Sequence, residues 1–300
     1  MAIEGQFFIN TPISQATLYV QEESLTSYKT TSPWSGFGEI KAFAREIDYA
    51  DNGFVFRLYT ATRTADVVRY VGTENIITVP ESVTYEDDEF IVTRLGDECF
   101  KDCFSPVSVK VPSSVTSLGT GCFQGCYSLT SVSLPSTLTA LSDYCFDGCN
   151  FLSSIYLPSA LTTIGEGTFK NCKFLTWIRI PAGVTSLGKN VFDGCEALLD
   201  VTCDAVKCPS VRDFGEFPIS EATLTVPDES YELYRKSYPW SLFGTITDFS
   251  GTTGINGTPA LDTNSAQSVY GLDGTRRPAT AKGVNIIRTA DGKTKKVMTR

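Results

Sequence analysis

A strict repeat of 23 residues constrains the fold of this chain more than any other feature of its sequence. Several independent columns of residues share this step. Phenylalanine recurs at Phe100, Phe123, Phe146, Phe169 and Phe192, cysteine at Cys103, Cys126, Cys149, Cys172 and Cys195, and proline at Pro112, Pro135, Pro158 and Pro181. Columns of leucine or isoleucine and of glycine follow the same step. Because chance does not produce several columns with one period, residues 95–203 are predicted to be stacked copies of one structural unit.

Each unit reads as a short strand, a second short apolar segment and a turn. In the unit that begins at residue 129, Leu129, Val132 and Leu134 point to one side, and Pro135 ends the strand. The Phe and Cys columns lie three residues apart, as on one face of a helical turn. A unit this short cannot bury its own apolar side, so neighbouring units must stack. The sequence therefore predicts an α/β solenoid whose apolar columns become continuous ladders.

The pattern L-x-x-V-x-L-P-x-x-L-x-x-L-G-x-x-x-F-x-x-C resembles the BspA-like leucine-rich repeats of surface proteins of Bacteroidetes. Residues 53–96 resemble the opening β-hairpins of that family, and residues 222–246 resemble its closing unit of a strand, a helix and a Trp/Phe pair. The resemblance implies a leucine-rich-repeat solenoid over 46–249, with a β-hairpin opening cap and a strand–helix closing cap. It also implies a secreted or cell-surface protein that binds or adheres to a host protein, another microbe or a glycan.

The closing unit occurs twice in the sequence. Residues 12–40 match residues 218–246 at a constant offset of 206, so that Trp34 corresponds to Trp240 and Phe37 to Phe243. Since a closing cap normally follows a repeat array, residues 1–45 are expected to be the closing cap of a truncated upstream array.

The composition changes after residue 249. Residues 250–268 are rich in Gly, Thr, Asn and Ser, as in a flexible linker. Residues 269–300 are expected to be a basic C-terminal β segment, whose net charge of +6 leaves −15 on the rest of the chain. This segment resembles short C-terminal segments of secreted Bacteroidetes proteins, some of which direct type IX secretion. A small β-hairpin with a solvated basic face is the alternative interpretation.

Composition excludes several classes of function. The chain has no histidine, which removes the Ser-His-Asp and Cys-His arrangements and the commonest metal ligand. Its formal charge of −9 does not fit a nucleic-acid-binding protein. No run of residues approaches the roughly 18 apolar residues of a membrane span, and the first residues lack the pattern of a signal peptide. We therefore expect a non-catalytic protein without a cofactor, located outside the cell or on its surface, whose signal peptide has been removed or truncated.

Ten cysteines allow three interpretations. They could form a disulfide framework, although stacked parallel side chains keep Cβ atoms farther apart than a disulfide prefers. Cys99, Cys103, Cys122 and Cys126 could bind a metal ion, but the column of Cys99 continues as Thr168 and Val191, which a ligand set would not tolerate. The third interpretation, free thiols packed in the core, is preferred. Cys203 and Cys208 form the one pair worth testing for a disulfide.

The outward positions of the strand ladder carry the candidate ligand-binding residues. Most of these positions hold small polar residues, such as Ser131 and Ser133. Tyr156, Trp177 and Arg179 depart from this pattern, and aromatic residues beside arginine are enriched at binding hot spots. The expected partner is an extracellular protein or a glycan. Two alternatives stay open: Trp177 covers a neighbouring coil, or the chain is a structural spacer without a ligand of its own.

Overall fold

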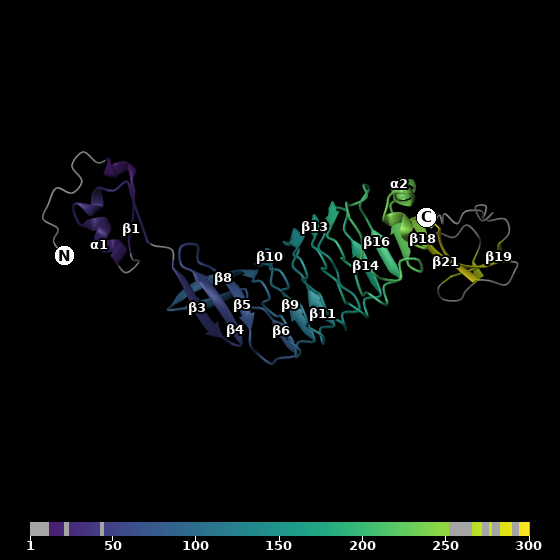
Figure 1. The fold of residues 1–300 in the computed structure, drawn as a ribbon, viewed down its shortest axis with the longest axis horizontal. Helices are drawn as coiled ribbons and strands as arrows, with labels where there is room; N and C mark the ends of the chain where they lie inside the picture. Colours follow the sequence, from purple (N-terminus) through teal and green to yellow (C-terminus); the bar gives the residue numbers. More distant parts are fainter. Residues whose placement is uncertain are drawn as a thin grey trace.

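Residues 45–251 fold into a solenoid, seen lengthwise in Figure 1. The structure is a computed structural model that describes residues 12–20, 24–42 and 45–251, together with the backbone of four strands between residues 266 and 299. One continuous apolar core runs from Phe54 in the opening strands to Ile246 in the last strand of the solenoid. The opening strands, the repeats and the closing cap are therefore parts of one packed body.

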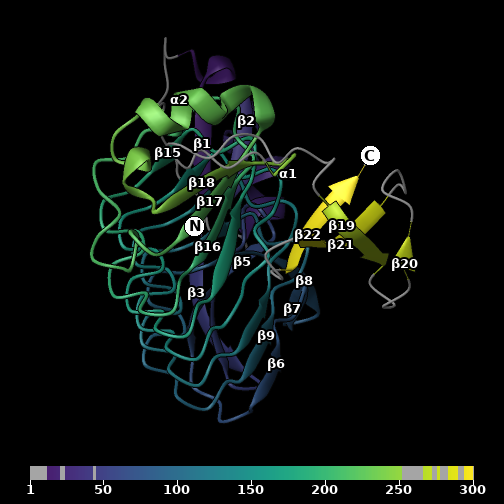
Figure 2. The ribbon, with the colours of Figure 1, turned by 90° about the vertical axis from the view of Figure 1, so that its right-hand side faces the viewer.

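One side of the solenoid is a ladder of parallel strands (Figures 1 and 2). The strands are β6 (Ile76–Thr78), β9 (Ser108–Lys110), β11 (Ser131–Ser133), β14 (Trp177–Ile180), β16 (Asp200–Cys203), β17 (Thr223–Val226) and β18 (Thr245–Asp248). Val109 lies opposite Val132, and Ile178 opposite Val201, so adjacent rungs differ by 23 residues. The period expected from the sequence is thus confirmed as the length of one coil.

A second, narrower ladder runs beside the first. It consists of the two-residue strands β10 (Ser117–Leu118), β12 (Ala140–Leu141), β13 (Thr163–Ile164) and β15 (Ser186–Leu187). The second residue of each strand is buried, which places the Leu/Ile column of the repeat in the core. The sequence column and the buried column are therefore the same residues.

The third side of each coil is a series of turns, and here the expected helical turn is absent. In the described coils, residues with positive φ interrupt the backbone twice per repeat, which a right-handed helix does not allow. They include Glu98 and Asp102, Tyr144 and Gly148, and Asn190 and Gly194. Turn amides also donate forward to the next coil: the Phe123 amide binds the Cys145 carbonyl at 2.8 Å. The repeats are therefore coils of a β-solenoid, and the α/β label does not describe them.

The phenylalanine column forms a buried stack along the solenoid axis. Ring centroids of successive members lie between 5.1 Å (Phe100–Phe123) and 6.2 Å (Phe169–Phe192) apart. The stack continues beyond the repeats, onto Tyr70 at one end and Phe214 at the other. Each ring is thus covered on both faces by its neighbours.

The opening strands form a mixed sheet that continues into the second ladder. They are β3 (Glu46–Asp51), β4 (Phe54–Tyr59), β5 (Thr64–Tyr70), β7 (Ser82–Tyr85) and β8 (Asp88–Leu95). Strand β8 pairs in parallel with both β5 and β10, and so joins the sheet to the coils.

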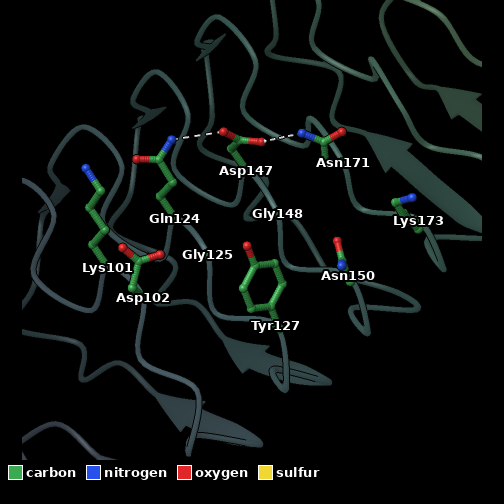
Figure 3. Close-up of a pocket in the computed structure, with 10 residues that line it drawn as sticks. All are labelled: Lys101, Asp102, Gln124, Gly125, Tyr127, Asp147, Gly148, Asn150, Asn171 and Lys173. Carbon is green, nitrogen blue, oxygen red and sulfur yellow. Dashed lines mark hydrogen bonds between the residues drawn. The ribbon is translucent and has the colours of Figure 1, made fainter.

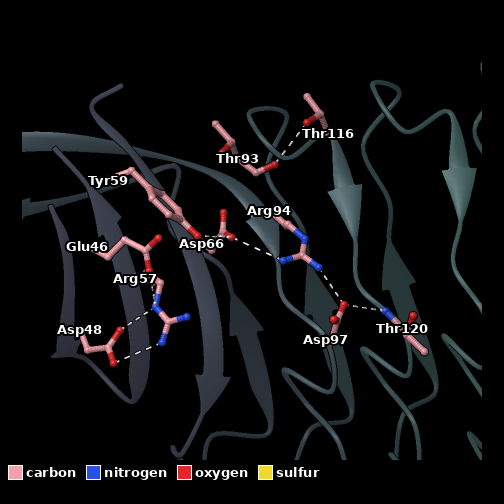
Figure 4. Close-up of polar contacts among 10 residues, drawn as sticks. All are labelled: Glu46, Asp48, Arg57, Tyr59, Asp66, Thr93, Arg94, Asp97, Thr116 and Thr120. Atoms are coloured by element: carbon pink, nitrogen blue, oxygen red, sulfur yellow. Dashed lines mark hydrogen bonds and ion pairs between the residues drawn. The ribbon is translucent and has the colours of Figure 1, made fainter. Parts of the chain in front are cut away.

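Polar side chains tie these strands to the first coil (Figure 4). The Tyr59 hydroxyl donates to Asp66 at 3.1 Å, and Arg94 reaches Asp66 at 3.6 Å and Asp97 at 2.7 Å. Asp97 in turn accepts a hydrogen bond from the Thr120 amide at 3.1 Å. These carboxylates have structural partners, so the acidic residues of the opening sheet are part of its architecture.

The closing cap covers the far end of the core. Its elements are β17, η4 (Asp228–Ser230), α2 (Tyr231–Lys236), η5 (Trp240–Leu242) and β18. Tyr234, Trp240 and Phe243 are buried, and Trp240 packs edge-on against Phe214 with ring centroids 4.9 Å apart. Among the described residues, no helix is long and apolar enough to cross a membrane.

Residues 12–42 repeat the architecture of the closing cap on a smaller apolar core. Their elements are η1 (Ile13–Gln15), β1 (Thr17–Val20), α1 (Leu25–Thr30), η3 (Trp34–Gly36) and β2 (Glu39–Ala42), and β1 pairs with β2 in parallel as β17 does with β18. Trp34 and Phe37 are partly exposed, whereas their counterparts Trp240 and Phe243 are buried.

The C-terminal strands form a sheet of their own in the order β20-β19-β21-β22. Their bounds are β19 (Ala266–Gly271), β20 (Arg276–Arg277), β21 (Gly283–Thr289) and β22 (Thr294–Thr299). All of their pairings are antiparallel. Most of the expected linker, residues 252–265, lies outside the described residues.

A matched pair of phenylalanines tests whether the buried stack stabilises the solenoid. Phe146 is 0% exposed in the middle of the stack, whereas Phe151, five residues later, is 55% exposed. We expect Phe146→Ala to lower the free energy of unfolding by about 3–5 kcal/mol, because it leaves a cavity between two rings. Phe151→Ala should change it by less than about 1 kcal/mol. Urea unfolding followed by circular dichroism measures both, and equal losses would show that the stack is not the source of stability.

Candidate binding surface on the strand ladder

The structure brings Tyr156, Trp177 and Arg179 together on the outer face of the strand ladder. Tyr156 is 78% exposed, and its ring meets the Trp177 ring edge to face, with centroids 5.4 Å apart and planes at 71°. Trp177 and Arg179 point outward from the same strand, β14, while Ile178 between them is buried. Trp177 is partly exposed, so it contacts its neighbouring coil and still presents surface to solvent.

Arg179 is held in place by a residue that the sequence did not indicate. Its Nε donates a hydrogen bond to Asp204 Oδ2 at 2.8 Å, and this contact raises the pKa of Arg179. The Asp204 side chain is largely buried, and its other carboxylate oxygen has no hydrogen-bond partner among the described residues. The Arg179 side chain remains 63% exposed. The hydrogen bond at Nε thus fixes the Arg179 side chain, while its terminal amino groups are exposed to solvent.

The strand ladder is interrupted where Tyr156 lies. Strand β11 pairs with β9, and β14 pairs with β16, but residues 154–157 between them belong to no strand. Within the described chain, the backbone groups of these four residues form no backbone hydrogen bonds. Ile155 still packs into the core and Tyr156 still points outward. The coil therefore keeps its place in the stack without the strand pairing of the coils on either side.

The residues around this patch are small. Ser154 precedes Tyr156, and the outward positions of β16 and β17 carry Asp200, Thr202, Thr223 and Thr225. Arg179 and Tyr156 share a column of the repeat with Ser133 and Lys110. The aromatic pair and Arg179 therefore project beyond the small polar side chains that surround them.

All ten cysteines are free, and eight are buried. Four successive members of the Cys column donate from Sγ to the carbonyl oxygen of a Phe in the preceding coil, for example Cys126 to Phe100 at 3.0 Å and Cys149 to Phe123 at 3.2 Å. Burial raises the pKa of Cys195 to about 12 and of Cys103 and Cys203 to about 11. The Cys203 thiol instead accepts a hydrogen bond from the Tyr234 hydroxyl at 3.2 Å and is not bonded to Cys208. This geometry supports the interpretation that the thiols pack the core.

In the described part of the chain, no three His, Cys, Asp or Glu side chains are grouped so that they could hold a metal ion. The acidic turn at residues 86–89 illustrates the point, because Asp88 pairs with Arg63, and Glu89 accepts a hydrogen bond from Ser82 at 2.6 Å.

Comparison with known proteins identifies the repeat. Residues 77–208 match the model of the BspA type leucine rich repeat region in six copies. These residues are a BspA-type leucine-rich repeat region. The resemblance read from the columns of the sequence is thereby confirmed for the repeat region. No curated protein matches this sequence.

Two solved structures show the same fold as this chain. A leucine rich repeat protein of T. pallidum is 23% identical, with a TM-score of 0.50; the alignment covers 63% of this chain and 95% of the other. A leucine rich cell surface protein of Faecalibacterium prausnitzii A2-165 is also 23% identical, with a TM-score of 0.52, and the alignment covers 83% of this chain. This chain spans 60% of the length of the second structure.

The buried thiols give a prediction about reactivity. At pH 8 most of the ten thiols should react slowly with a disulfide reagent in the folded protein and rapidly after denaturation, because burial removes the thiolate. Titration with and without guanidinium measures the difference. Rapid reaction of all ten thiols in the folded protein would contradict the packed arrangement.

The same pKa shifts predict how stability depends on pH. The folded pKa of these thiols lies above the unfolded value of roughly 8.5, so the folded chain holds its thiol protons to higher pH. The stabilising contribution is complete below about pH 8.5 and is lost as the pH rises through about 11–12. Urea midpoints measured between pH 8 and pH 11 should therefore fall steadily, and a flat profile would contradict the shifts.

Proposed function

We propose that this protein is a non-catalytic binding protein of the cell surface or the extracellular space, and that it binds another protein through Tyr156, Trp177 and Arg179. The exposed Tyr156–Trp177 pair beside the anchored Arg179 carries the proposal. The similar structure from Faecalibacterium prausnitzii is that of a cell surface protein, which is consistent with this location.

A protein partner fits this surface for two physical reasons. Tyr, Trp and Arg are the residue types that dominate the energy of protein interfaces, since they bury large areas at a low entropic cost. The contact with Asp204 uses only Nε of Arg179, so the terminal amino groups remain free to bind a carboxylate. An acidic side chain next to an aromatic or aliphatic one would match both parts of the surface.

The alternative is a spacer that holds other domains apart without binding a ligand. The same solenoid would serve that role, but a spacer does not require an exposed aromatic pair at the interruption of the ladder. Contiguous exposed apolar surface, unlike single exposed residues, is typical of interaction sites.

Single substitutions test the binding surface. We expect Trp177→Ala and Arg179→Ala each to weaken binding to an extracellular protein by tenfold or more, because loss of a hot-spot side chain costs about 2 kcal/mol or more. The measurement is surface plasmon resonance against a panel of purified matrix and serum proteins, with the partner first identified on the unmodified chain.

Lys110→Ala is the matched control. Lys110 occupies the same outward column as Arg179 and carries the same charge, but it lies on β9, away from the aromatic pair. Its substitution should leave the affinity within about twofold. If Lys110→Ala weakens binding as much as Arg179→Ala, the interaction is a general charge effect. If the panel yields no saturable binding, the spacer function is favoured.

We also infer that residues 12–42 are the closing cap of a separate repeat array. They share the order of elements of residues 218–248 in the closing cap, while Trp34 and Phe37 are less buried than Trp240 and Phe243. We expect Trp240→Ala to lower the free energy of unfolding by about 3–5 kcal/mol, because Trp240 is buried and its Nε1 donates to the Pro209 carbonyl. Trp34→Ala should cost much less in this chain. Equal losses would show that residues 12–42 are a complete unit by themselves.

A further inference from the structure

A hollow of about 500 Å³ opens on the turn side of the solenoid, where ten residues line it (Figure 3). Its floor exists because two successive members of one repeat column are glycine. The column reads Asp102, Gly125, Gly148, Asn171 and Gly194, and every member has a positive φ. Asp and Asn adopt this conformation more readily than other side chains, and they occupy the column at both ends of the hollow. The bare backbone of Gly125 and Gly148 lies between them.

One wall of the hollow is a fixed chain of polar side chains. Gln124 Nε2 donates to Asp147 Oδ2 at 2.9 Å, and Asn171 Nδ2 donates to Asp147 Oδ1 at 3.0 Å. Figure 3 shows the three side chains in a row along one edge. Since both amides donate to Asp147, their carbonyl oxygens are held in position as further acceptors.

Opposite this wall, the hollow is lined by one aromatic residue, Tyr127. The Tyr127 ring stacks on Phe104 with centroids 5.5 Å apart and planes at 4°, and its hydroxyl points across the hollow in Figure 3. In the neighbouring column, Phe151 stacks on Phe174 at 5.3 Å and 8°. These four rings are 45–58% exposed, unlike the buried phenylalanine stack of the core. Only Tyr127 lines the hollow itself, and the two stacked pairs together are called the aromatic strip.

The charges at the hollow do not favour an anion. Lys101 pairs with Glu98 at 2.5 Å, and Lys173 pairs with Glu196 at 2.9 Å. Both lysines that line the hollow thus have a carboxylate partner, while Asp102 and Asp147 add negative charge. A phosphate or an acidic sugar would meet carboxylates without a free cation.

We propose that this hollow, together with the aromatic strip, is a binding site for a neutral oligosaccharide. The apolar C–H faces of a sugar ring pack on exposed aromatic rings, and its hydroxyl groups donate to and accept from amides and carboxylates. The site lies on the turn side and shares no residue with the Tyr156–Trp177–Arg179 surface on the strand ladder. It is therefore independent of the protein-binding function proposed above.

The test uses isothermal titration with neutral hexasaccharides of glucose and of mannose in several linkages, added to the full chain. We expect saturable binding to at least one of them. Tyr127→Ala should weaken it roughly tenfold or more, because an aromatic contact of about 1.4 kcal/mol is lost. Tyr127→Phe keeps the ring and should lose less, so the pair separates stacking from hydrogen bonding by the hydroxyl.

Gly148→Asn is a second variant that fills the hollow without removing any contact. A Cβ at Gly148 would lie 3.6 Å or more from its nearest neighbours, and Asn171 already adopts the same left-handed conformation in the next coil. The variant should therefore fold normally, which thermal unfolding checks, and should weaken sugar binding at least tenfold. Trp177→Ala, on the strand ladder, should leave sugar binding unchanged.

Three results would overturn the proposal: no saturable binding to any neutral hexasaccharide, binding that Gly148→Asn leaves intact, or binding confined to acidic sugars or to peptides. Because Trp177→Ala and Gly148→Asn act on different sides of the solenoid, failure of the sugar site leaves the protein-binding surface unaffected, and the reverse also holds.

Discussion

Stacking of each coil on the next is the interaction on which the whole molecule depends. The backbone hydrogen bonds inside a coil of 23 residues are short turns, such as Cys126 N–H to the Phe123 carbonyl, whereas its strands pair with other coils and turn amides such as that of Phe123 donate forward to Cys145. The same stacking covers each phenylalanine ring and lets a buried thiol such as Cys126 donate to a carbonyl of the preceding coil. Stability is therefore a property of neighbouring pairs.

Because each coil is stabilised by the coils on both sides, the first and last coils need another structure to cover their free side. At the first end, Tyr70 stacks on Phe100, and the mixed opening sheet gives β10 a partner in β8. At the last end, Phe214 and Trp240 cover the stack, and α2 lies beyond β16 and β17 (Figure 2). At both ends, aromatic side chains from outside the repeats cover the last ring of the phenylalanine stack. The end of the apolar core is thereby shielded from solvent in both cases.

The parts of the structure that follow from inward packing were predictable from the sequence, and those that depend on backbone detail were not. The period, the buried Phe and Leu columns and the packed cysteines are visible as repeated residue types. The turns looked helical because Phe and Cys are three residues apart, and the spacing does not reveal the positive φ of Tyr144 or Glu98. The sequence marked Tyr156, Trp177 and Arg179, yet gave no sign that Asp204, which replaces proline at the next position of the proline column, would contact Arg179, nor of the missing ladder hydrogen bonds at residues 154–157.

Inward positions are fixed by the stack, so specific recognition has to be encoded in the outward positions and in the loops between strands. The strand-ladder surface and the glycine hollow are both departures from the repeat at outward positions: large residues replace serine in one, and glycine occupies positions that Asp102 and Asn171 fill elsewhere in the other. Neither departure disturbs the Phe, Cys or Leu columns, whose members are buried beside both sites except for the partly buried Cys103. A solenoid of this kind can therefore carry more than one recognition surface, since its core does not depend on the residues that form them.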